Sequence, residues 1–161
     1  MKTAGLVALI LAGGPALAQH ATPLLSGYAH AVDGATLKLG GVTIRLAGAQ
    51  ALPLEAHLLD RHGQAYPAGL FARDVLASLI AEQVVGCRAF KPPEDSASLV
   101  AVCASPVAPD LALAMLKRGW AVLAHHDGKP EAPGYAPMET EARQNRRGLW
   151  QGGDIHPRAK P

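Results

Sequence analysis

The pattern of hydrophobic and polar positions changes from short strand-like runs near the start of the chain to helical spacing further along. The first runs cover residues 25–32, 36–39 and 42–47. The turn dipeptides Asp33-Gly34 and Gly40-Gly41 separate them, which is typical of hairpins. The pattern therefore predicts a three-stranded meander, followed by a looser stretch over residues 48–67.

Helical spacing of apolar residues begins at residue 69 and predicts an amphipathic helix over residues 69–82. Two further strands are expected at residues 84–90 and 99–104, on either side of a proline-containing connection at residues 91–96. Cys87 and Cys103 lie on these two strands at equal distances from the middle of the connection, so they face each other in a regular hairpin. This position predicts a disulfide, which should contribute about 3 kcal/mol to stability.

The last third of the chain is predicted to be mainly helical. A second helix is expected over residues 109–118, with Pro109 or Asp110 at its start and Gly119 at its end. A short buried segment follows at residues 119–123, then a loop at residues 125–137. A third helix is expected over residues 138–147, ended by Gly148, and residues 152–161 are expected to form a flexible tail.

This order of elements predicts an α+β fold: a five-stranded OB-fold β-barrel with three added helices. The chain has 161 residues, which fits one domain, and the expected folded part is residues 19–151. The formal net charge of +2 is too small to indicate a nucleic-acid partner by itself.

The first 18 residues have the three parts of a signal peptide. Lys2 is followed by an apolar run at residues 4–12 and by the small-x-small site Ala16-Leu17-Ala18. The alternative is a buried N-terminal helix. Because no later apolar run is long enough to span a membrane, we expect a periplasmic or secreted protein, in which paired cysteines are the normal state.

Several segments, taken together, resemble the staphylococcal nuclease (thermonuclease) family. The resemblance covers residues 25–150 and is carried by these pieces: VDGATLKL at residues 32–39, IRLAG at 44–48, the helix at 69–82, VAVC at 100–103, LKRGWAVL at 116–123 and ETEARQNRRGLW at 139–150. It implies the same barrel with helices. It also implies hydrolysis of phosphodiesters in DNA and RNA, with a calcium ion held by carboxylates, a glutamate that assists water and two arginines that neutralise the phosphate.

Most of those functional positions differ in this sequence. Arg45 matches the first arginine of the family, but the two metal-binding aspartates correspond to Ala35 and Gln50, and the second arginine to Ser98. The family glutamate falls at Pro53, or at Glu55 if two residues are inserted. Calcium needs hard, charged oxygen ligands, which alanine and glutamine do not supply, so no cofactor is expected unless the site has been rebuilt.

Two hypotheses follow for the function. The first is a catalytically degenerate pseudo-nuclease that binds a nucleic acid, a nucleotide or another exported protein. The second is an active metal-dependent phosphodiesterase with a rebuilt site that uses Arg45 and Glu55, with His57 or His62 as a further candidate. Arg45 itself is equally compatible with a phosphate anchor and with a structural arginine that ties a strand to a loop, whereas Glu55 reads more readily as a solvated loop acid.

Other charged residues offer weaker candidates. A transition-metal site is conceivable if two loops converge; its residues would be His57, Asp60, His62, His125, His126 and Asp127. A basic patch on the last helix is a candidate ligand-binding surface, although cations near a helix C-terminus are also ordinary partners of the helix dipole; the patch consists of Arg143, Arg146 and Arg147.

Overall fold

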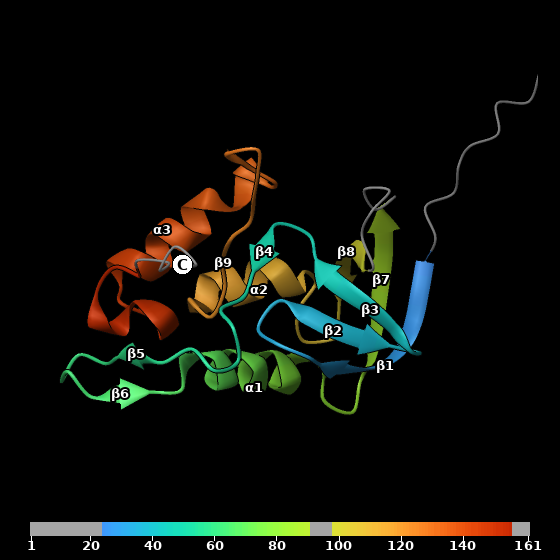
Figure 1. Cartoon of the computed structure of the whole chain (residues 1–161). Helices are drawn as coiled ribbons and strands as arrows, with labels where there is room; N and C mark the ends of the chain where they lie inside the picture. Colours follow the sequence, from blue (N-terminus) through green and yellow to red (C-terminus); the bar gives the residue numbers. More distant parts are fainter. Residues whose placement is uncertain (1–23, 91–97, 156–161) are drawn as a thin grey trace, which may run out of the picture.

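The computed structural model describes residues 24–90 and 98–155 (Figure 1). The predicted signal peptide at residues 1–18, the connection at residues 91–96 and the last part of the predicted tail lie outside the described residues. Within the described residues no helix is long and apolar enough to cross a membrane.

Five strands close into a barrel in the order β1-β2-β3-β8-β7. The β3–β8 pair is parallel and the other pairs are antiparallel. This confirms the predicted α+β fold with a five-stranded OB-type barrel. The strands are β1 (Leu24–Ala31), β2 (Thr36–Leu39), β3 (Val42–Leu46), β7 (Val84–Phe90) and β8 (Leu99–Ala104).

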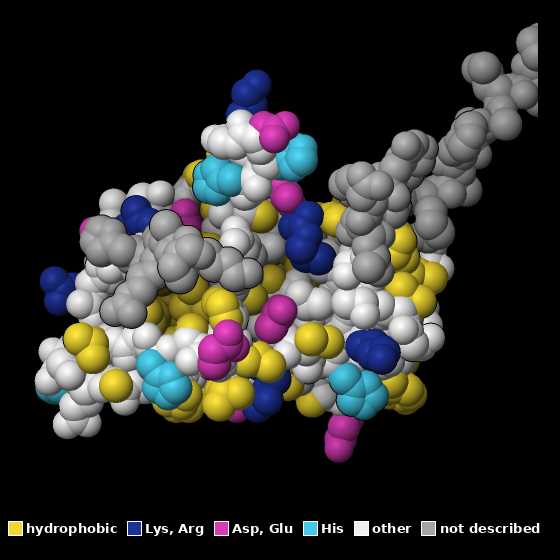
Figure 2. Space-filling view, viewed as in Figure 1, with side chains coloured by type: hydrophobic (Ala, Val, Ile, Leu, Met, Phe, Trp, Pro, Cys, Tyr) yellow, Lys and Arg dark blue, Asp and Glu magenta, His cyan; other side chains and the backbone are white. Residues whose placement is uncertain are grey.

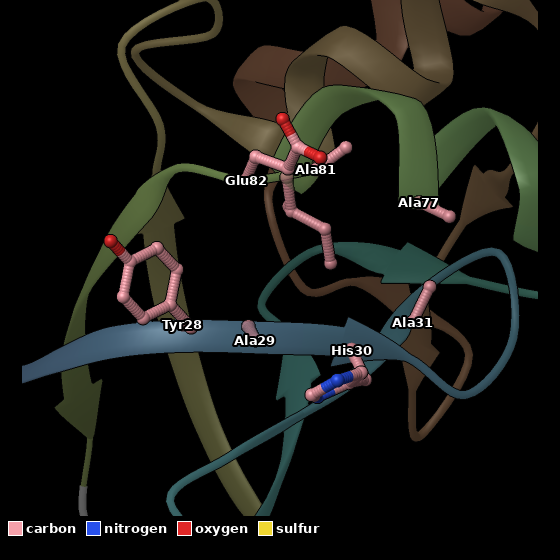
Figure 3. Close-up of a pocket in the computed structure, with 8 residues that line it drawn as sticks. Tyr28, Ala29, His30, Ala31, Ala77, Ala81 and Glu82 are labelled. Atoms are coloured by element: carbon pink, nitrogen blue, oxygen red, sulfur yellow. The ribbon is translucent and has the colours of Figure 1, made fainter.

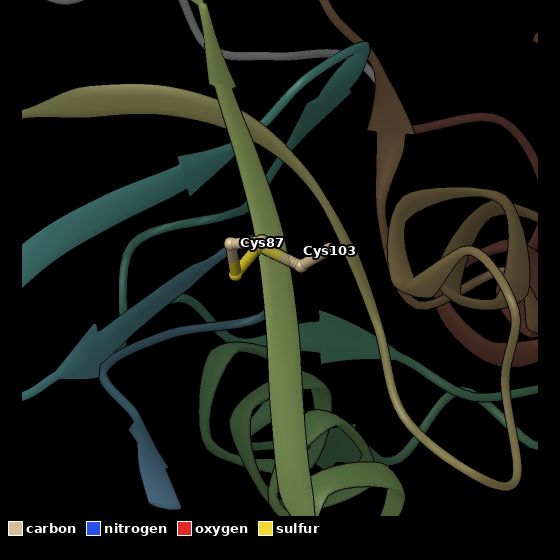
Figure 4. Close-up of a disulfide and its surroundings, with 2 residues drawn as sticks. All are labelled: Cys87 and Cys103. Carbon is tan, nitrogen blue, oxygen red and sulfur yellow. A yellow bond between two sulfur atoms is a disulfide. The ribbon is translucent and has the colours of Figure 1, made fainter. Parts of the chain in front are cut away.

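The barrel interior is filled by apolar residues that alternate with outward-facing ones along the strands, as the period of two requires. Leu37, Ile44 and Leu46 are fully buried there. Cys87 and Cys103 are direct partners in the β7–β8 pair and form a disulfide inside this core (Figure 4). The predicted disulfide is therefore confirmed, and it crosslinks two barrel strands.

The described residues contain three α-helices, as predicted: α1 (Ala68–Ile80), α2 (Leu111–Arg118) and α3 (Ala136–Gln144). The ends of α2 agree with the sequence signals. The Asp110 side chain accepts a hydrogen bond from the backbone N–H of Leu113 at the start, and Gly119 has a left-handed conformation at the end. α1 and α2 pack against barrel strands, and α3 packs mainly on α2.

Several short strands lie outside the predicted strands, most of them in stretches where the sequence predicts loops. β4 (Ala49–Gln50) pairs with β9 (Val122–Leu123), and β5 (Leu58–Leu59) pairs with β6 (Ala65–Tyr66). The predicted loop at residues 125–137 contains a hairpin of β10 (His125–His126) and β11 (Lys129–Pro130), the 3-10 helix η1 (Pro133–Tyr135) and the start of α3.

The prediction of a loop without secondary structure at residues 125–137 is wrong because Asp127 and Gly128 both have a positive φ, at 50° and 74°. That pair of conformations makes a tight hairpin turn. The same dipeptide type at Asp33-Gly34 is part of a wider turn, in which the Asp33 carboxylate accepts a hydrogen bond from the N–H of Ala35.

The third helix ends earlier than predicted, at Gln144, because the backbone reverses at Arg146 (φ 51°). A second 3-10 helix, η2 (Gly148–Gly152), follows. Gly152 lies against the backbone of Leu59, and Ile155 packs on the small apolar cluster beside β5 and β6. The packed part of the chain thus extends past the expected start of the tail at residue 152.

Candidate binding site

Arg45 lies at the edge of an open groove on the outer face of the barrel. Its backbone is in register with Val100 on β8, and Val100 is in register with Phe90 on β7. Paired residues of neighbouring strands point to the same face, so these three side chains lie in one row. The Arg45 groove has a volume of about 490 Å³ and is lined by Arg45, Ala47, Gly48, Phe90, Val100, Val102, His126, Glu131, Ala132 and Tyr135.

The guanidinium of Arg45 is paired with a carboxylate. Its Nη1 and Nη2 atoms donate hydrogen bonds of 2.9 and 3.0 Å to the two oxygens of Glu131. The backbone N–H of Gly48 donates a third, longer bond of 3.3 Å to the same carboxylate. The Arg45 and Glu131 side chains are 35% and 22% exposed. Arg45 therefore ties its strand to the segment that follows β11, and the Nη1–Nη2 edge of its guanidinium is engaged by this carboxylate.

The pairing changes the titration of Glu131. Burial by itself raises the pKa of this carboxyl, but the hydrogen bonds and charge of Arg45, together with the Gly48 amide, outweigh it and hold the pKa below its ordinary value of 4.5. The positive field of His126 acts in the same direction. Glu131 is thus ionised at neutral pH and cancels the charge of Arg45 within the groove.

The segment that carries Glu131 can approach β3 because residue 48 is glycine. A Cβ atom added there would lie 2.7 Å from the Cβ of Ala132 and 3.1 Å from the ring of Tyr135. Gly48 also has a φ of 80°, which favours glycine. The Tyr135 hydroxyl donates a hydrogen bond to Asp110, and burial followed by that contact raises the pKa of Tyr135 to about 12.

The two positions that the family resemblance relates to metal ligands carry uncharged side chains, unlike the Arg45–Glu131 pair. Ala35 is 1% exposed and presents only a methyl group to the core. Gln50 ends β4 on the exposed side. These two residues do not fit a calcium ion, since neither offers a carboxylate. Ser98, at the position of the second arginine, directly precedes β8 and is partly buried.

Glu55 and the loop histidines do not line the Arg45 groove, with the exception of His126. Glu55 and His57 are exposed, and the His57 ring lies 2.9 Å from the Glu55 backbone carbonyl oxygen. The Asp60 carboxylate accepts hydrogen bonds from the N–H groups of His62 and Gln64. Across residues 24–90 and 98–155, no three side chains of His, Cys, Asp or Glu come together as a possible metal site.

The three arginines of the predicted basic patch have different surroundings. Arg143 stacks over the Trp150 ring at 4.3 Å and lies 3.6 Å from a carboxylate oxygen of Asp154. Arg147 forms an ion pair with Glu141 at 3.0 Å. Arg146 lines a separate polar cavity. The patch therefore does not form one basic surface, and Figure 2 shows Lys and Arg side chains scattered singly among acidic ones on the face drawn there.

A further hollow lies between β1 and the C-terminal end of α1, and Figure 3 shows its lining. Alanines make up much of its wall, and Tyr28, His30 and Glu82 lie around it. None of the residues singled out from the sequence lines this hollow, and it lies on other strands than the Arg45 groove.

The closed barrel with three packed helices and a groove beside Arg45 defines an OB-type domain of the nuclease class. The family model described as staphylococcal nuclease homologue matches residues 43–152. This is more than half of the chain, so the chain belongs to the staphylococcal nuclease homologue family. No curated protein matches it.

Glu131 is the main residue of the groove that sequence reasoning missed. It stands in the stretch predicted as a loop, and no motif marks it. Phe90, Val100 and Val102 were recognised only as strand residues, although the period of two places them opposite the buried residues Ala89, Ala101 and Cys103. That alternation was the available signal for an outward-facing apolar row.

Proposed function

We propose that this protein is an exported, non-catalytic member of the nuclease family whose Arg45 groove binds a polypeptide partner. The observation that carries the proposal is the bidentate pairing of Arg45 with Glu131. Arg45 matches a functional arginine of the family, and here its guanidinium is hydrogen-bonded to the carboxylate of Glu131.

The residue types at the positions that the family uses for metal binding support the loss of hydrolysis. Phosphodiester cleavage in this family depends on carboxylates that hold calcium, and Ala35 and Gln50 stand at those positions. Removing a single group that stabilises a transition state typically costs about a hundredfold or more in rate. With both metal ligands, the second arginine and the arginine–phosphate contact all absent together, little catalysis is expected.

The groove chemistry favours a polypeptide over a polyanion. Phe90 is 48% exposed and, with Val100 and Val102, gives the groove an apolar floor. The Arg45–Glu131 pair adds no net charge, and the Glu131 carboxylate repels an approaching phosphate. Protein interfaces commonly combine a central apolar patch with paired polar groups at its edge, and aromatic residues are enriched there.

Export is the remaining part of the proposal. The N-terminal signal pattern supports it, and so does the Cys87–Cys103 disulfide, because such bonds persist in oxidising compartments. The proposal predicts that the mature chain begins at Gln19, which mass spectrometry of protein recovered from the periplasm or the medium would measure.

The first experiment measures cleavage of denatured DNA and of RNA by the purified mature protein with calcium, zinc, manganese or chelator. We expect no metal-dependent cleavage. Arg45→Ala serves as the control for a contaminating nuclease, and Glu55→Ala tests the rebuilt site. Cleavage that requires a metal and disappears in either variant would overturn the proposal in favour of an active phosphodiesterase.

The second experiment tests the ligand class by selecting peptides from a displayed library on the folded domain. We expect peptides rich in apolar residues whose binding is lost in Val102→Glu. Val42→Glu is the matched control, because Val42 is 38% exposed on β3 but does not line the groove. Equal binding to both variants, or failure to select any peptide, would count against a polypeptide groove.

A further inference from the structure

A polar cavity lies between the β5–β6 hairpin and the turn after α3. Its volume is about 570 Å³, and it is lined by Arg61, Gln144, Asn145, Arg146, Gly148 and Gln151. Two of these side chains are guanidinium groups, three are amides, and none is a carboxylate. A lining that offers many N–H donors and a charge of +2 is suited to an anion.

The two arginines of this cavity keep their donors available. Among the residues that the structure describes, neither Arg61 nor Arg146 forms an ion pair or a side-chain hydrogen bond. The nearby arginines differ, because Arg143 and Arg147 are engaged with carboxylates. The neighbouring Asp60 carboxylate accepts a hydrogen bond from the backbone N–H of Gln64 in its own hairpin. This bond is the main cause that lowers the pKa of Asp60.

The backbone at Arg146 supports a role for its side chain. The N–H of Arg147 donates to the carbonyl of Ala142, and the N–H of Arg146 donates to that of Arg143. This is a Schellman motif with Arg146 at the left-handed position, where φ is 51°. α2 ends in the same motif and has glycine, Gly119, at that position. An arginine there is locally unfavourable, and such outliers cluster at functional sites.

Tertiary contacts hold the two walls of the cavity together. The Tyr66 hydroxyl on β6 donates to the carbonyl of Gly148 at 3.2 Å. Gly152 packs against the carbonyl of Leu59, where a Cβ atom would lie at 2.0 Å. The hairpin that carries Arg61 is therefore fixed against the turn that carries Arg146, so the backbone on both sides of the cavity is held in place, and the two exposed arginine side chains extend from it.

We propose that this cavity, the Arg61–Arg146 pocket, binds the phosphate or sulfate group of a small soluble ligand. The guanidinium forks of Arg61 and Arg146 bind the oxyanion. The amides of Gln144 and Gln151 bind the rest of the ligand, together with the Oδ1 of Asn145, whose Nδ2 already donates to the Glu141 carbonyl at 2.8 Å. Among the described residues that line the pocket, none is aromatic and could stack on a base, so the oxyanion is the recognised group. The site is separate from the Arg45 groove and does not depend on the function proposed for it.

The test is titration of the mature protein with inorganic phosphate and with sulfate, followed by amide chemical shifts. We expect saturable shifts at residues 61 and 144–151, and binding weaker by about tenfold in Arg61→Ala and in Arg146→Gly. Arg146→Gly should also melt at the same or a higher temperature, because glycine relieves the left-handed position. Retained folding with lost binding separates a ligand role from a structural one.

Arg73→Ala is the matched control, because Arg73 is a surface arginine 37% exposed in its side chain and paired with its neighbour Asp74. It should bind phosphate as the wild type does. No saturable binding of either ion at tens of millimolar, or equal weakening in Arg73→Ala and Arg146→Gly, would overturn the proposal. Because Arg45 is outside the pocket, failure here is distinguishable from failure of the proposed polypeptide groove.

Discussion

The guanidinium of Arg45 and the carboxylate of Glu131, which are 86 positions apart in the chain, face each other through two hydrogen bonds of 2.9 and 3.0 Å. The pair joins the third barrel strand to the segment between β11 and α3. It places a negative charge against the Nη1–Nη2 edge of the Arg45 guanidinium. The local charge balance of the groove is thus set by this contact.

The Arg45–Glu131 pair should make a modest contribution to stability. Glu131→Gln removes the charge and one acceptor, and we expect the free energy of unfolding to fall by about 1 kcal/mol, since the pair is bidentate but partly exposed. Urea denaturation measures it. Asp74→Asn is the control, because it breaks the more exposed Arg73–Asp74 pair and should have almost no effect. Equal losses in the two variants would contradict a special role for the Arg45 pair.

The same pair should give a defined pH dependence. The folded-state pKa of Glu131 is lowered below 4.5, so its contribution is fully present above the unfolded pKa and is lost as pH falls through the folded pKa. We expect the difference in unfolding free energy between wild type and Glu131→Gln to be constant from neutral pH down to about pH 5 and to shrink below that. A difference that grows on acidification would show that the sign is wrong.

Glu131→Gln should also expose the cation of Arg45 to other anions. We expect binding of a short single-stranded oligonucleotide to rise about tenfold over the wild type, because an anion no longer has to compete with the carboxylate. Fluorescence anisotropy at fixed ionic strength measures this. The double variant Arg45→Ala/Glu131→Gln should return to the wild-type value. A rise that persists in the double variant would have to come from elsewhere on the surface.

The buried disulfide should stabilise the barrel mainly by restricting the unfolded chain. Its cysteines are 16 positions apart, and the double variant Cys87→Ala/Cys103→Ala should lose about 3 kcal/mol. The slope of the unfolding free energy against urea should also increase, because the unfolded chain without the crosslink exposes more surface. A loss below about 1 kcal/mol would indicate that the crosslink adds little to strands already paired.

Gly119 should tolerate no side chain. Its φ is 76°, and a Cβ atom would lie 2.4 Å from the carbonyl oxygen of Arg147. Gly63 has the same φ of 76° but nothing within 4 Å, so it isolates the backbone cost from the clash. We expect Gly63→Ala to cost about 1 kcal/mol and Gly119→Ala at least about 2 kcal/mol more. Thermal unfolding of both variants gives the comparison, and similar losses would refute the close approach of α2 to the turn after α3.

Much of the fold was predictable because its signals are local. The barrel strands follow from short apolar runs and turn residues, and the ends of α2 follow from Asp110 and Gly119. The disulfide followed from the symmetric position of its cysteines in a hairpin. The end of α3 was misplaced because Arg146 adopts a conformation that the sequence pattern assigns to glycine, so the expected stop at Gly148 came too late.

The candidate sites were less predictable. The sequence by itself determined that alanine and glutamine stand at positions 35 and 50, where the family resemblance predicts metal-binding carboxylates, because residue identity needs no structure. It also determined the five barrel strands and the three α-helices, since periodicity and capping act between near neighbours. Only the tertiary structure decided that Arg45 pairs with Glu131 and that Arg61 and Arg146 line the same cavity. Those contacts join segments far apart in the chain, and no local pattern records which distant partner a long, flexible side chain will reach.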